Sequence, residues 1–289
     1  MVAHTIEIKH PRRFYIGGAW VEPATPETID VLDCTTEEVV ATVAKAGSDD
    51  MRRAVAAARD AFDNGPWPRL TPQQRGAFLV RVAERMEAMN DAFARGWSIE
   101  SGIVHRIAKP RIGLFLGGAF RQYAGLASTY AFSEAHRSAT GHKGFKVREP
   151  VGVTAVILPW NGPAGLLAYK VAPALLAGCT MVVKAPVEAP TSAWLFAEIV
   201  DELGLPPGVF NVIAADRDVS EELVRHPDVD KITFTGSTAA GRRIAAAAGE
   251  RIARVTLELG GKSPALVLDD YDIDEAAAVL GAGYFGYLA

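Results

Sequence analysis

The chain has 289 residues, of which 49% are hydrophobic and 22% are charged, so it is long and apolar enough to bury a sizeable core. Its formal net charge of -4 gives no general attraction to nucleic acid or to an anionic membrane surface. These values exclude a disordered chain and a basic nucleic-acid-binding protein, and they indicate a folded globular protein.

Cysteines and apolar runs bear on the cellular compartment. The two cysteines, Cys34 and Cys179, are too few for a disulfide framework, which favours a reducing cytosol. Residues 1–10 lack the apolar stretch of a secretory signal. The longest apolar run, residues 171–183, is interrupted by Pro173 and is too short to cross a bilayer. We therefore expect a cytoplasmic protein that has no membrane partner.

The first 127 residues contain a hairpin pattern followed by helical patterns. Gly17-Gly18 lies between two β-rich runs, which is a hairpin signal. Ser48 stands where a helix N-cap is expected, and Pro72 suits the first turn of a second helix. The expected elements are strands Phe14–Ile16 and Ala19–Val21 and helices Asp49–Phe62, Thr71–Met86 and Gly113–Ala127, the last rich in small residues and closely packed.

From Val151 onward, apolar strands alternate with helices at intervals of about 25 residues, as in βαβ units. Near-continuous apolar strands indicate an α/β fold with a Rossmann-like parallel sheet and helices on both faces. The expected strands are Val153–Leu158, Thr180–Lys184, Val209–Ile213, Lys231–Phe234 and Arg254–Glu258, and the expected helices are Ala164–Ala177, Thr191–Leu203, Ser220–Arg225 and Ala239–Ala248.

Two further segments stand apart from this regular pattern. Residues 128–150 are polar and turn-rich, which predicts a protruding hairpin. After Pro264, a strand over Ala265–Leu268 and a helix over Ile273–Gly286 begin a second α/β domain that stays incomplete. We expect their apolar faces to be unburied, so that the chain has low solubility or binds a complementary chain.

Four residues of chemical interest fall at or just after the ends of expected strands: Asn161, Lys184, Gly236 and Glu258. Ligands of open parallel sheets bind at the carboxyl ends of the strands, so these residues are expected to share one edge. No Gly-x-Gly-x-x-Gly follows any strand. The turn at Gly236 nevertheless opens a helix whose N–H groups suit a pyrophosphate, although an ordinary turn capped by Ser or Thr explains it equally well.

Two segments are far more specific: Pro159-Trp160-Asn161-Gly162-Pro163 and Leu-Glu-Leu-Gly-Gly-Lys-Ser-Pro at residues 257–264. Tyr-Ile-Gly-Gly-Ala-Trp at residues 15–20 and Asp-Lys-Ile-Thr-Phe-Thr-Gly-Ser at residues 230–237 accompany them in order. With these motifs, the chain resembles the aldehyde dehydrogenase superfamily from Phe14 to its last residue.

The resemblance implies NAD(P)-dependent oxidation of an aldehyde to a carboxylic acid through a cysteine thioester. A thiolate attacks the aldehyde, and the Asn161 side-chain amide with a backbone N–H holds the oxyanion. Hydride passes to the nicotinamide, and Glu258 activates the water that hydrolyses the thioester. Removing one oxyanion donor costs about 3 kcal/mol in such sites. Leu257 and Leu259 are expected to give Glu258 the partly buried environment that tunes a general base.

The resemblance also implies cofactor contacts, and no metal. Lys184 would contact the adenosine ribose, although a strand-end lysine in solvent fits the same position. Many relatives have a glutamate three residues later; here Val187 takes that place and Glu188 follows, which leaves NAD and NADP both open. Trp160 either packs beside the cofactor or fills the core, and residues 214–217 receive no phosphate contact. The implied cofactor-binding residues are Ile157, Leu158, Pro159, Trp160, Lys184, Glu188, Gly236, Ser237, Leu259 and Gly260.

The nucleophile that the resemblance implies has no counterpart among the cysteines. It would follow the Glu258 motif and the helix after it, whereas Cys179 reads as a core residue and Cys34 lies among the N-terminal strands. The chain is therefore expected to be truncated before the catalytic cysteine and inactive alone. The alternatives are a non-catalytic nucleotide-binding or oligomerising remnant, and a relative that makes acyl-CoA or reduces an acyl phosphate.

On this interpretation the chain divides into four parts. Residues 1–127 are the N-terminal strands and helices of the cofactor-binding domain, and residues 128–150 are a hairpin of the oligomerisation type. Residues 151–262 are the Rossmann-like NAD(P)-binding core, and residues 263–289 begin the catalytic domain. The expected partners are a small aldehyde substrate, whose identity the sequence does not indicate, and further copies of the full-length protein in a homo-oligomer.

Overall fold

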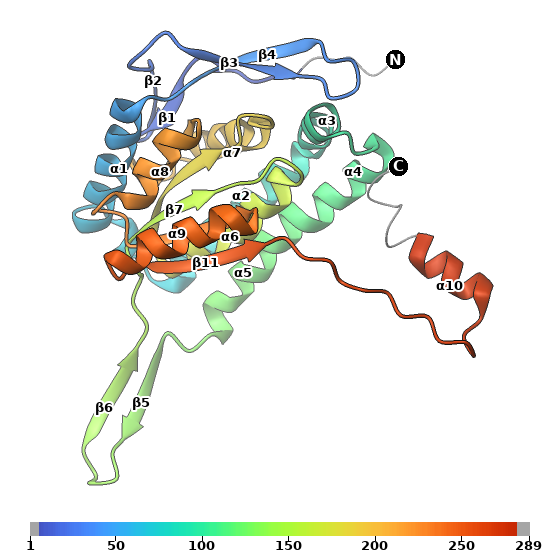
Figure 1. The fold of residues 1–289 in the computed structure, drawn as a ribbon. Coiled ribbons are helices and arrows are strands. Elements are labelled where there is room, and N and C mark those ends of the chain that lie inside the picture. Colours follow the sequence, from blue (N-terminus) through green and yellow to red (C-terminus); the bar gives the residue numbers. More distant parts are fainter. Residues whose placement is uncertain (1–5, 282–289) are drawn as a thin grey trace.

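A seven-stranded sheet forms the centre of the protein, whose computed structural model describes residues 6–281 apart from the side chain of Phe115 (Figure 1). The strand order is β11-β10-β7-β8-β9-β1-β2. The five strands expected to be parallel are parallel, and the expected N-terminal hairpin pairs antiparallel. The hairpin also joins the sheet beside β9, so the sheet is mixed. The strands are β1 (Phe14–Ile16), β2 (Ala19–Val21), β7 (Val153–Ile157), β8 (Thr180–Ala185), β9 (Phe210–Ala214), β10 (Lys231–Gly236) and β11 (Arg254–Leu259).

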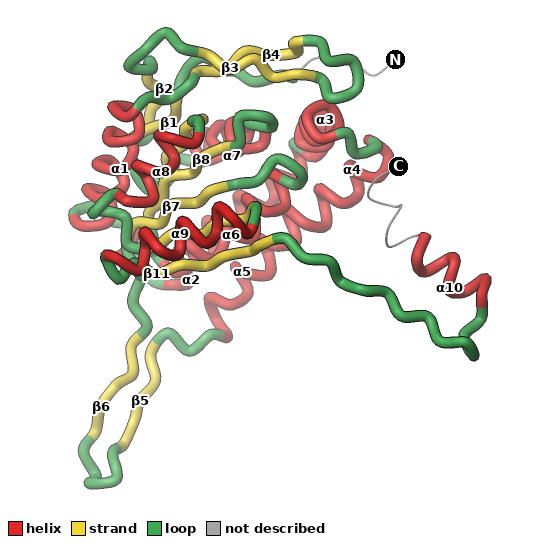
Figure 2. The backbone as a smooth tube through the Cα atoms, in the orientation of Figure 1, coloured by secondary structure: helices red, strands yellow, loops and turns green. Residues whose placement is uncertain are grey.

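Helices cover both faces of the sheet, as predicted, because its central strands are apolar on both sides (Figure 2). One layer contains α1 (Ser48–Asp63), α8 (Arg217–Arg225) and α9 (Thr238–Glu250). The opposite layer contains α6 (Pro163–Ala177) and α7 (Thr191–Glu202), with α2 (Pro72–Ala88) and α5 (Gly118–Thr129) packed outside it. Within residues 6–281, none of the helices combines the length and apolar composition needed to cross a bilayer.

The start of α1 differs from the prediction. Ser48 was expected to be the N-cap, but it is the first helical residue and Gly47 takes the cap position. The reason is Asp50, whose carboxylate accepts hydrogen bonds from the N–H groups of Gly47 (3.1 Å) and Ala24 (2.9 Å). The Ser48 hydroxyl instead donates to Oε1 of Glu222 at 2.6 Å, which ties α1 to α8.

The region between α2 and α5 is more helical than the sequence indicated. It contains α3 (Asn90–Ser101) and α4 (His105–Ile112), neither of which was predicted. The helix expected over residues 113–127 is a π-helical turn, Gly113–Gly117, followed by α5. In α3, Gly96 permits close contact with α7, since an added Cβ would lie 2.8 Å from Cγ2 of Thr191.

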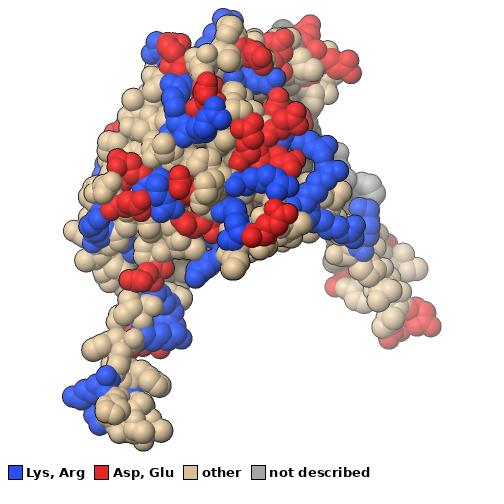
Figure 3. All heavy atoms as spheres, turned by 60° about the vertical axis from the view of Figure 1, so that its left-hand side comes forward, with Lys and Arg blue, Asp and Glu red and all other residues tan. Residues whose placement is uncertain are grey.

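Two smaller antiparallel pairs lie outside the main sheet. β3 (Thr28–Leu32) pairs with β4 (Val39–Ala44), and a short 3₁₀ helix, Trp67–Arg69, precedes α2. β5 (Ser133–Arg137) pairs with β6 (Lys143–Val147) in the segment expected to be a hairpin, which protrudes from the body. The side chains of its two strands are exposed apart from the half-buried Glu134, Phe145 by 74%, and Lys and Arg gather along it (Figure 3).

The predicted strand over Ala265–Leu268 is wrong. These residues have no regular structure, because no strand in residues 6–281 lies beside them to accept ladder hydrogen bonds. Leu266 is 87% exposed and Leu268 is 70% exposed, which agrees with the expectation of unburied apolar groups. The helix predicted to follow begins as expected with α10 (Ile273–Leu280), and its last residues, from 282, lie outside the described residues.

Candidate active site

The order in which the chain adds strands to the sheet reverses at β7. From β7 the chain passes to β8 and β9 on one side, whereas β10 and β11 lie on the other side. The segments after β7 and β10 therefore run apart and leave a crevice at the carboxyl edge of the sheet. Asn161 follows β7, and Gly236 ends β10. Lys184 and Glu258 are the penultimate residues of β8 and β11, so all four predicted residues share this edge.

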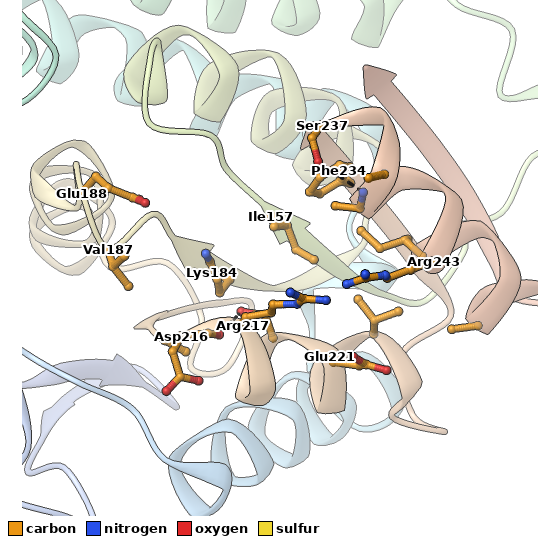
Figure 4. Close-up of a pocket in the computed structure, with 17 residues that line it drawn as sticks. Ile157, Lys184, Val187, Glu188, Asp216, Arg217, Glu221, Phe234, Ser237 and Arg243 are labelled. Carbon is orange, nitrogen blue, oxygen red and sulfur yellow. Dashed lines mark hydrogen bonds between the residues drawn. The ribbon is translucent and has the colours of Figure 1, made fainter. Parts of the chain in front are cut away.

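A cavity of about 620 Å³ lies between α8 and α9, beyond the ends of β7, β8 and β10 (Figure 4). Of the predicted cofactor-binding residues, it contains Ile157, Lys184, Glu188 and Ser237. Burial lowers the pKa of Lys184, while the carboxylates of Glu188 and Asp216 oppose that shift. Lys184 is thus half-buried in a cavity, and the solvent-facing alternative for this lysine is wrong.

The N-terminus of α9 opens into this cavity. Ser237 is the N-cap, and its hydroxyl accepts a hydrogen bond from the N–H of Ala240 at 3.2 Å. The simple capped turn is therefore present, and the same helix end also lines the cavity. Gly241 lets β11 pack closely on α9, because an added Cβ would lie 2.5 Å from Cδ2 of Leu259.

A second cavity, of about 790 Å³, adjoins the first at Ser237. It brings Asn161 and Glu258 together, although they are far apart in sequence. Trp160 lines it and is 55% exposed, so the core-filling interpretation of Trp160 is wrong. The other predicted residues that line it are Pro159, Gly236, Leu259 and Gly260.

Leu158 is the predicted cofactor-binding residue that lines neither cavity. Its side chain is 3% exposed, and its N–H donates to the carbonyl of Lys184 at 3.2 Å. This hydrogen bond extends the pairing of β7 with β8 by one residue beyond the strand. Leu158 is therefore a buried residue at the end of β7 and not part of either cavity lining.

The expected burial of Glu258 is wrong. Its side chain is exposed, Leu259 is 39% exposed and Leu257 is only half-buried. The physical reason is the position of β11, which within residues 6–281 forms the edge of the sheet and has a neighbouring strand on one side only. The flanking leucines therefore leave the carboxylate of Glu258 in water.

Comparison with known proteins identifies the family. The model of the aldehyde dehydrogenase family matches residues 20–288, which is nearly the whole chain. The chain belongs to the aldehyde dehydrogenase family. It is 42% identical to a geranial dehydrogenase of Castellaniella defragrans over 270 residues, which are 93% of this chain and 56% of that protein. The chain thus spans about half the length of the curated relatives it matches.

Solved structures of aldehyde dehydrogenases share the fold. A Mycobacterium tuberculosis aldehyde dehydrogenase complexed with NAD+ superposes with a TM-score of 0.90 at 39% identity, covering 93% of this chain and 56% of its own. A mutant of aldehyde dehydrogenase C from Pseudomonas syringae, complexed with NAD+ and octanal, gives a TM-score of 0.90 at 38% identity. It covers 96% of this chain and 57% of its own.

Helix α3 holds the Trp160-Asn161 loop of this aldehyde dehydrogenase chain, and sequence reasoning missed it. The Trp97 indole N–H donates to the carbonyl of Asn161 at 2.9 Å, and the Ser101 hydroxyl donates to the carbonyl of Trp160 at 2.7 Å. The spacing of Phe93 and Trp97 is a helical signal. Nothing in the sequence indicates which carbonyls these donors reach.

Lys170 is a second residue that sequence reasoning missed. It is 8% exposed in α6, lines the same cavity as Glu258, and donates to Oγ1 of Thr233 at 2.9 Å. Burial lowers its pKa to about 8, while the negative charge of Glu258 acts in the opposite direction. The available signal was a single lysine within the otherwise apolar helix Pro163–Ala177.

We predict that Lys170 titrates near pH 8 and that Glu258→Gln lowers its pKa further. The reason is that Gln removes the carboxylate that stabilises the ammonium. NMR titration of labelled lysine side chains measures both values. Glu188→Gln, in the other cavity, is the control and should leave Lys170 unchanged. An unchanged Lys170 pKa in Glu258→Gln would show that the two groups are not coupled.

Neither cysteine lines either cavity. Cys179 is 3% exposed, and burial raises the pKa of its thiol, which makes it a core residue as predicted. Cys34 is exposed, in the turn between β3 and β4. Among residues 6–281, no cluster of three His, Cys, Asp or Glu side chains is arranged to hold a metal ion.

Proposed function

We propose that this chain binds NAD(P)+ and supplies the oxyanion donor and general base of an aldehyde dehydrogenase that converts an aldehyde to a carboxylic acid. The observation that carries the proposal is the meeting of two cavities at Ser237. One contains a helix N-terminus and Lys184, and the other contains Asn161 and Glu258. Family membership and the NAD+ complexes of the relatives support the same activity.

The first cavity suits a dinucleotide in size and chemistry. Its volume of about 620 Å³ lies in the range of small-molecule sites. The N-terminus of α9 at Ser237 favours a pyrophosphate, and the ammonium of Lys184 can donate to ribose hydroxyls. In the second cavity, the buried hydroxyl of Thr235 has no partner among the described residues and is available to a ligand. The nicotinamide, when bound there, accepts the hydride that the oxidation releases.

Asn161 and Glu258 have complementary chemistry in the second cavity. The Asn161 amide donates a hydrogen bond to the substrate oxygen, and the bond strengthens as negative charge develops on that oxygen. The Glu258 carboxylate accepts a proton from water, which then attacks the acyl group. Hydrolysis assigned to Glu258 supports a free acid as the product rather than an acyl-CoA.

The thiol that this chemistry requires is neither Cys34 nor Cys179, because neither lines the second cavity. We therefore expect the 289-residue chain alone to bind nucleotide without oxidising aldehydes. Residues 151–262 are proposed as the nucleotide-binding core. The exposed strands β5 and β6 of residues 128–150 leave unpaired backbone edges, which supports a role in a cytoplasmic homo-oligomer.

The proposal predicts saturable NAD(P)+ binding that Ala240→Trp weakens at least tenfold, because the indole would occupy the first cavity beside Ser237. Isothermal titration calorimetry on the 289-residue chain measures this affinity. Ala246→Trp is the matched control, since Ala246 is exposed on the same helix and lines neither cavity. Absence of binding at millimolar NAD+ and NADP+ would overturn the proposed function.

A further inference from the structure

Two side chains of α3 hold the backbone on both sides of the Asn161 Cα atom. The Trp97 indole N–H donates to the carbonyl of Asn161, and the Ser101 hydroxyl donates to the carbonyl of Trp160. These carbonyls belong to the two planar peptide groups that flank the Asn161 Cα atom. Holding both groups restrains φ and ψ of Asn161, and these angles set the direction of its Cα–Cβ bond. The two hydrogen bonds therefore determine which way the Asn161 side chain leaves the backbone.

The loop around Asn161 has few other contacts to hold it. Residues 158–162 connect β7 to α6 without regular structure, and Trp160 and Asn161 are both exposed. The side-chain amide of Asn161 has no hydrogen-bond partner within residues 6–281. A donor that must turn toward the developing oxyanion stabilises it less than a donor that is already aimed at it. The aim of the Asn161 amide thus depends on the backbone that carries it.

Helix α3 is itself fixed against α7. Oε1 of Glu100 accepts hydrogen bonds from the N–H (3.0 Å) and the hydroxyl (2.5 Å) of Thr191 at the start of α7. Gly96 packs closely against the same threonine. Trp97 and Ser101 are four residues apart in α3, so they lie on one face of the helix. Both donors are therefore held in place before any ligand binds, as a preorganised site requires.

We propose that Trp97 and Ser101 are positioning residues: by restraining the backbone of Asn161, they aim its amide at the oxygen of the bound aldehyde. The inference rests on the proposed function, in which Asn161 donates to the oxyanion. Neither Trp97 nor Ser101 lines either cavity of the site, so they act through Asn161 and not on a ligand. Helix α3 thereby contributes to the chemistry of the second cavity without lining it.

NMR relaxation on the 289-residue chain reports the motion of both peptide groups. The dipeptide Trp-Asn occurs once in the sequence, so ¹³C-carbonyl tryptophan combined with ¹⁵N asparagine selects the peptide group of residues 160–161. The dipeptide Asn-Gly occurs twice, so ¹³C-carbonyl asparagine combined with ¹⁵N glycine selects the peptide groups of residues 161–162 and 64–65. The second of these is an internal reference, because Asn64 and Gly65 donate to carbonyls of α1.

Loss of either donor should loosen the peptide group that it holds. We expect Ser101→Ala to lower the order parameter of the 160–161 group by roughly a third, which is the difference between a rigid and a flexible backbone. Trp97→Phe should lower that of the 161–162 group by a similar amount, because phenylalanine keeps the ring but has no N–H. The 64–65 group should not change in either variant.

Kinetics test whether the restraint acts through the Asn161 amide. In a full-length chimera that joins residues 1–281 to the C-terminal part of the geranial dehydrogenase, Trp97→Phe and Ser101→Ala should each lower kcat about tenfold. Both should leave the affinity for 5′-ADP unchanged, because neither residue lines the first cavity. In an Asn161→Ala background the same substitutions should lower kcat by less than about twofold, since the amide that they position is gone. A purely structural contribution would lower kcat equally in both backgrounds.

Matched controls remove the same chemical groups without changing the loop. Trp67→Phe removes a buried indole N–H, and Ser98→Ala removes a buried hydroxyl of α3. Neither group has a hydrogen-bond partner among the described residues, so both variants should keep the parent kcat and order parameters. Ser101→Thr retains the hydroxyl and should also keep them. Far-UV circular dichroism confirms that each variant is folded.

The outcomes separate the inference from the proposed function. If Asn161→Ala itself keeps the parent kcat, the proposed function loses its oxyanion donor and the inference fails with it. If Asn161→Ala lowers kcat but Trp97→Phe and Ser101→Ala do not, the inference alone is overturned. If the two variants lower kcat equally with and without the Asn161 amide, they act on another group and the positioning role is wrong.

Discussion

Replacing Asn161 by alanine is expected to lower kcat by about 10²–10³-fold in a full-length chimera, because it removes one preorganised donor to the oxyanion. The chimera joins residues 1–281 to the C-terminal part of the geranial dehydrogenase, which is 42% identical to this chain where they align. The proposed mechanism requires that part to supply the thiol, since neither Cys34 nor Cys179 lines the cavity of Asn161. Steady-state formation of NAD(P)H measures the effect.

Two controls identify the role of Asn161 as chemical. Affinity for 5′-ADP, which lacks the nicotinamide, should be unchanged in Asn161→Ala, because Asn161 does not line the first cavity. Glu258→Gln in the same chimera should give a different defect: one rapid turnover of NAD(P)H and then almost none, because acyl hydrolysis loses its base. A kcat for Asn161→Ala within twofold of the parent chimera would contradict the proposed oxyanion site.

The central sheet was predictable from sequence because its strands are buried on both faces. Continuous apolar runs such as Val153–Ile157 are typical of parallel strands, and the helix-forming segments between them enforce the crossovers. The prediction of a strand over Ala265–Leu268 was wrong because a strand needs a hydrogen-bonded neighbour, which local sequence does not reveal. The Ser48 error has a similar origin, because the side chain of Asp50 decides where α1 begins.

The candidate site was predictable where it follows from topology. Carboxyl ends of parallel strands meet at one edge, so Lys184, Gly236 and Glu258 had to lie near one another. The missed residue Lys170 is a single charged residue in a helix, a pattern that solvent-facing residues share. Its place in a cavity depends on helix packing across the sheet. The exposure of Glu258 likewise depends on its strand being at the edge.

Replacing Glu100 by glutamine is expected to stabilise the protein above pH 8 by about 3–5 kcal/mol and to have little effect near pH 5. Glu100 is 6% exposed in α3, and its Oε1 accepts hydrogen bonds from the N–H (3.0 Å) and hydroxyl (2.5 Å) of Thr191. Oε2 has no partner among the described residues. Burial therefore raises the pKa of this carboxyl to about 8.

The direction in which stability changes with pH follows from proton linkage. Between the unfolded pKa of 4.5 and the folded pKa of about 8, the native state keeps a proton that the unfolded state has released. Stability from Glu100 is thus fully present below about pH 4.5 and is lost as the pH rises through about 8. Glutamine keeps the acceptor for Thr191 and cannot ionise, so the variant should lose this slope. Urea unfolding of both proteins at pH 5 and pH 9 measures the difference.

The Glu87→Gln variant tests whether stabilisation at high pH comes from removing a buried carboxyl or from removing any negative charge. Glu87 is exposed and paired with Arg121, which lowers the pKa of its carboxyl, so its replacement should not stabilise the protein at high pH. If the stability of Glu100→Gln depends on pH in the same way as that of the parent protein, the Glu100 carboxyl does not keep its proton in the native state, and the prediction is wrong. If the slope disappears, ionisation of Glu100 acts on α3, the helix whose Trp97 and Ser101 hold the loop of Asn161. Alkaline pH would then weaken the candidate active site through the helix that supports it.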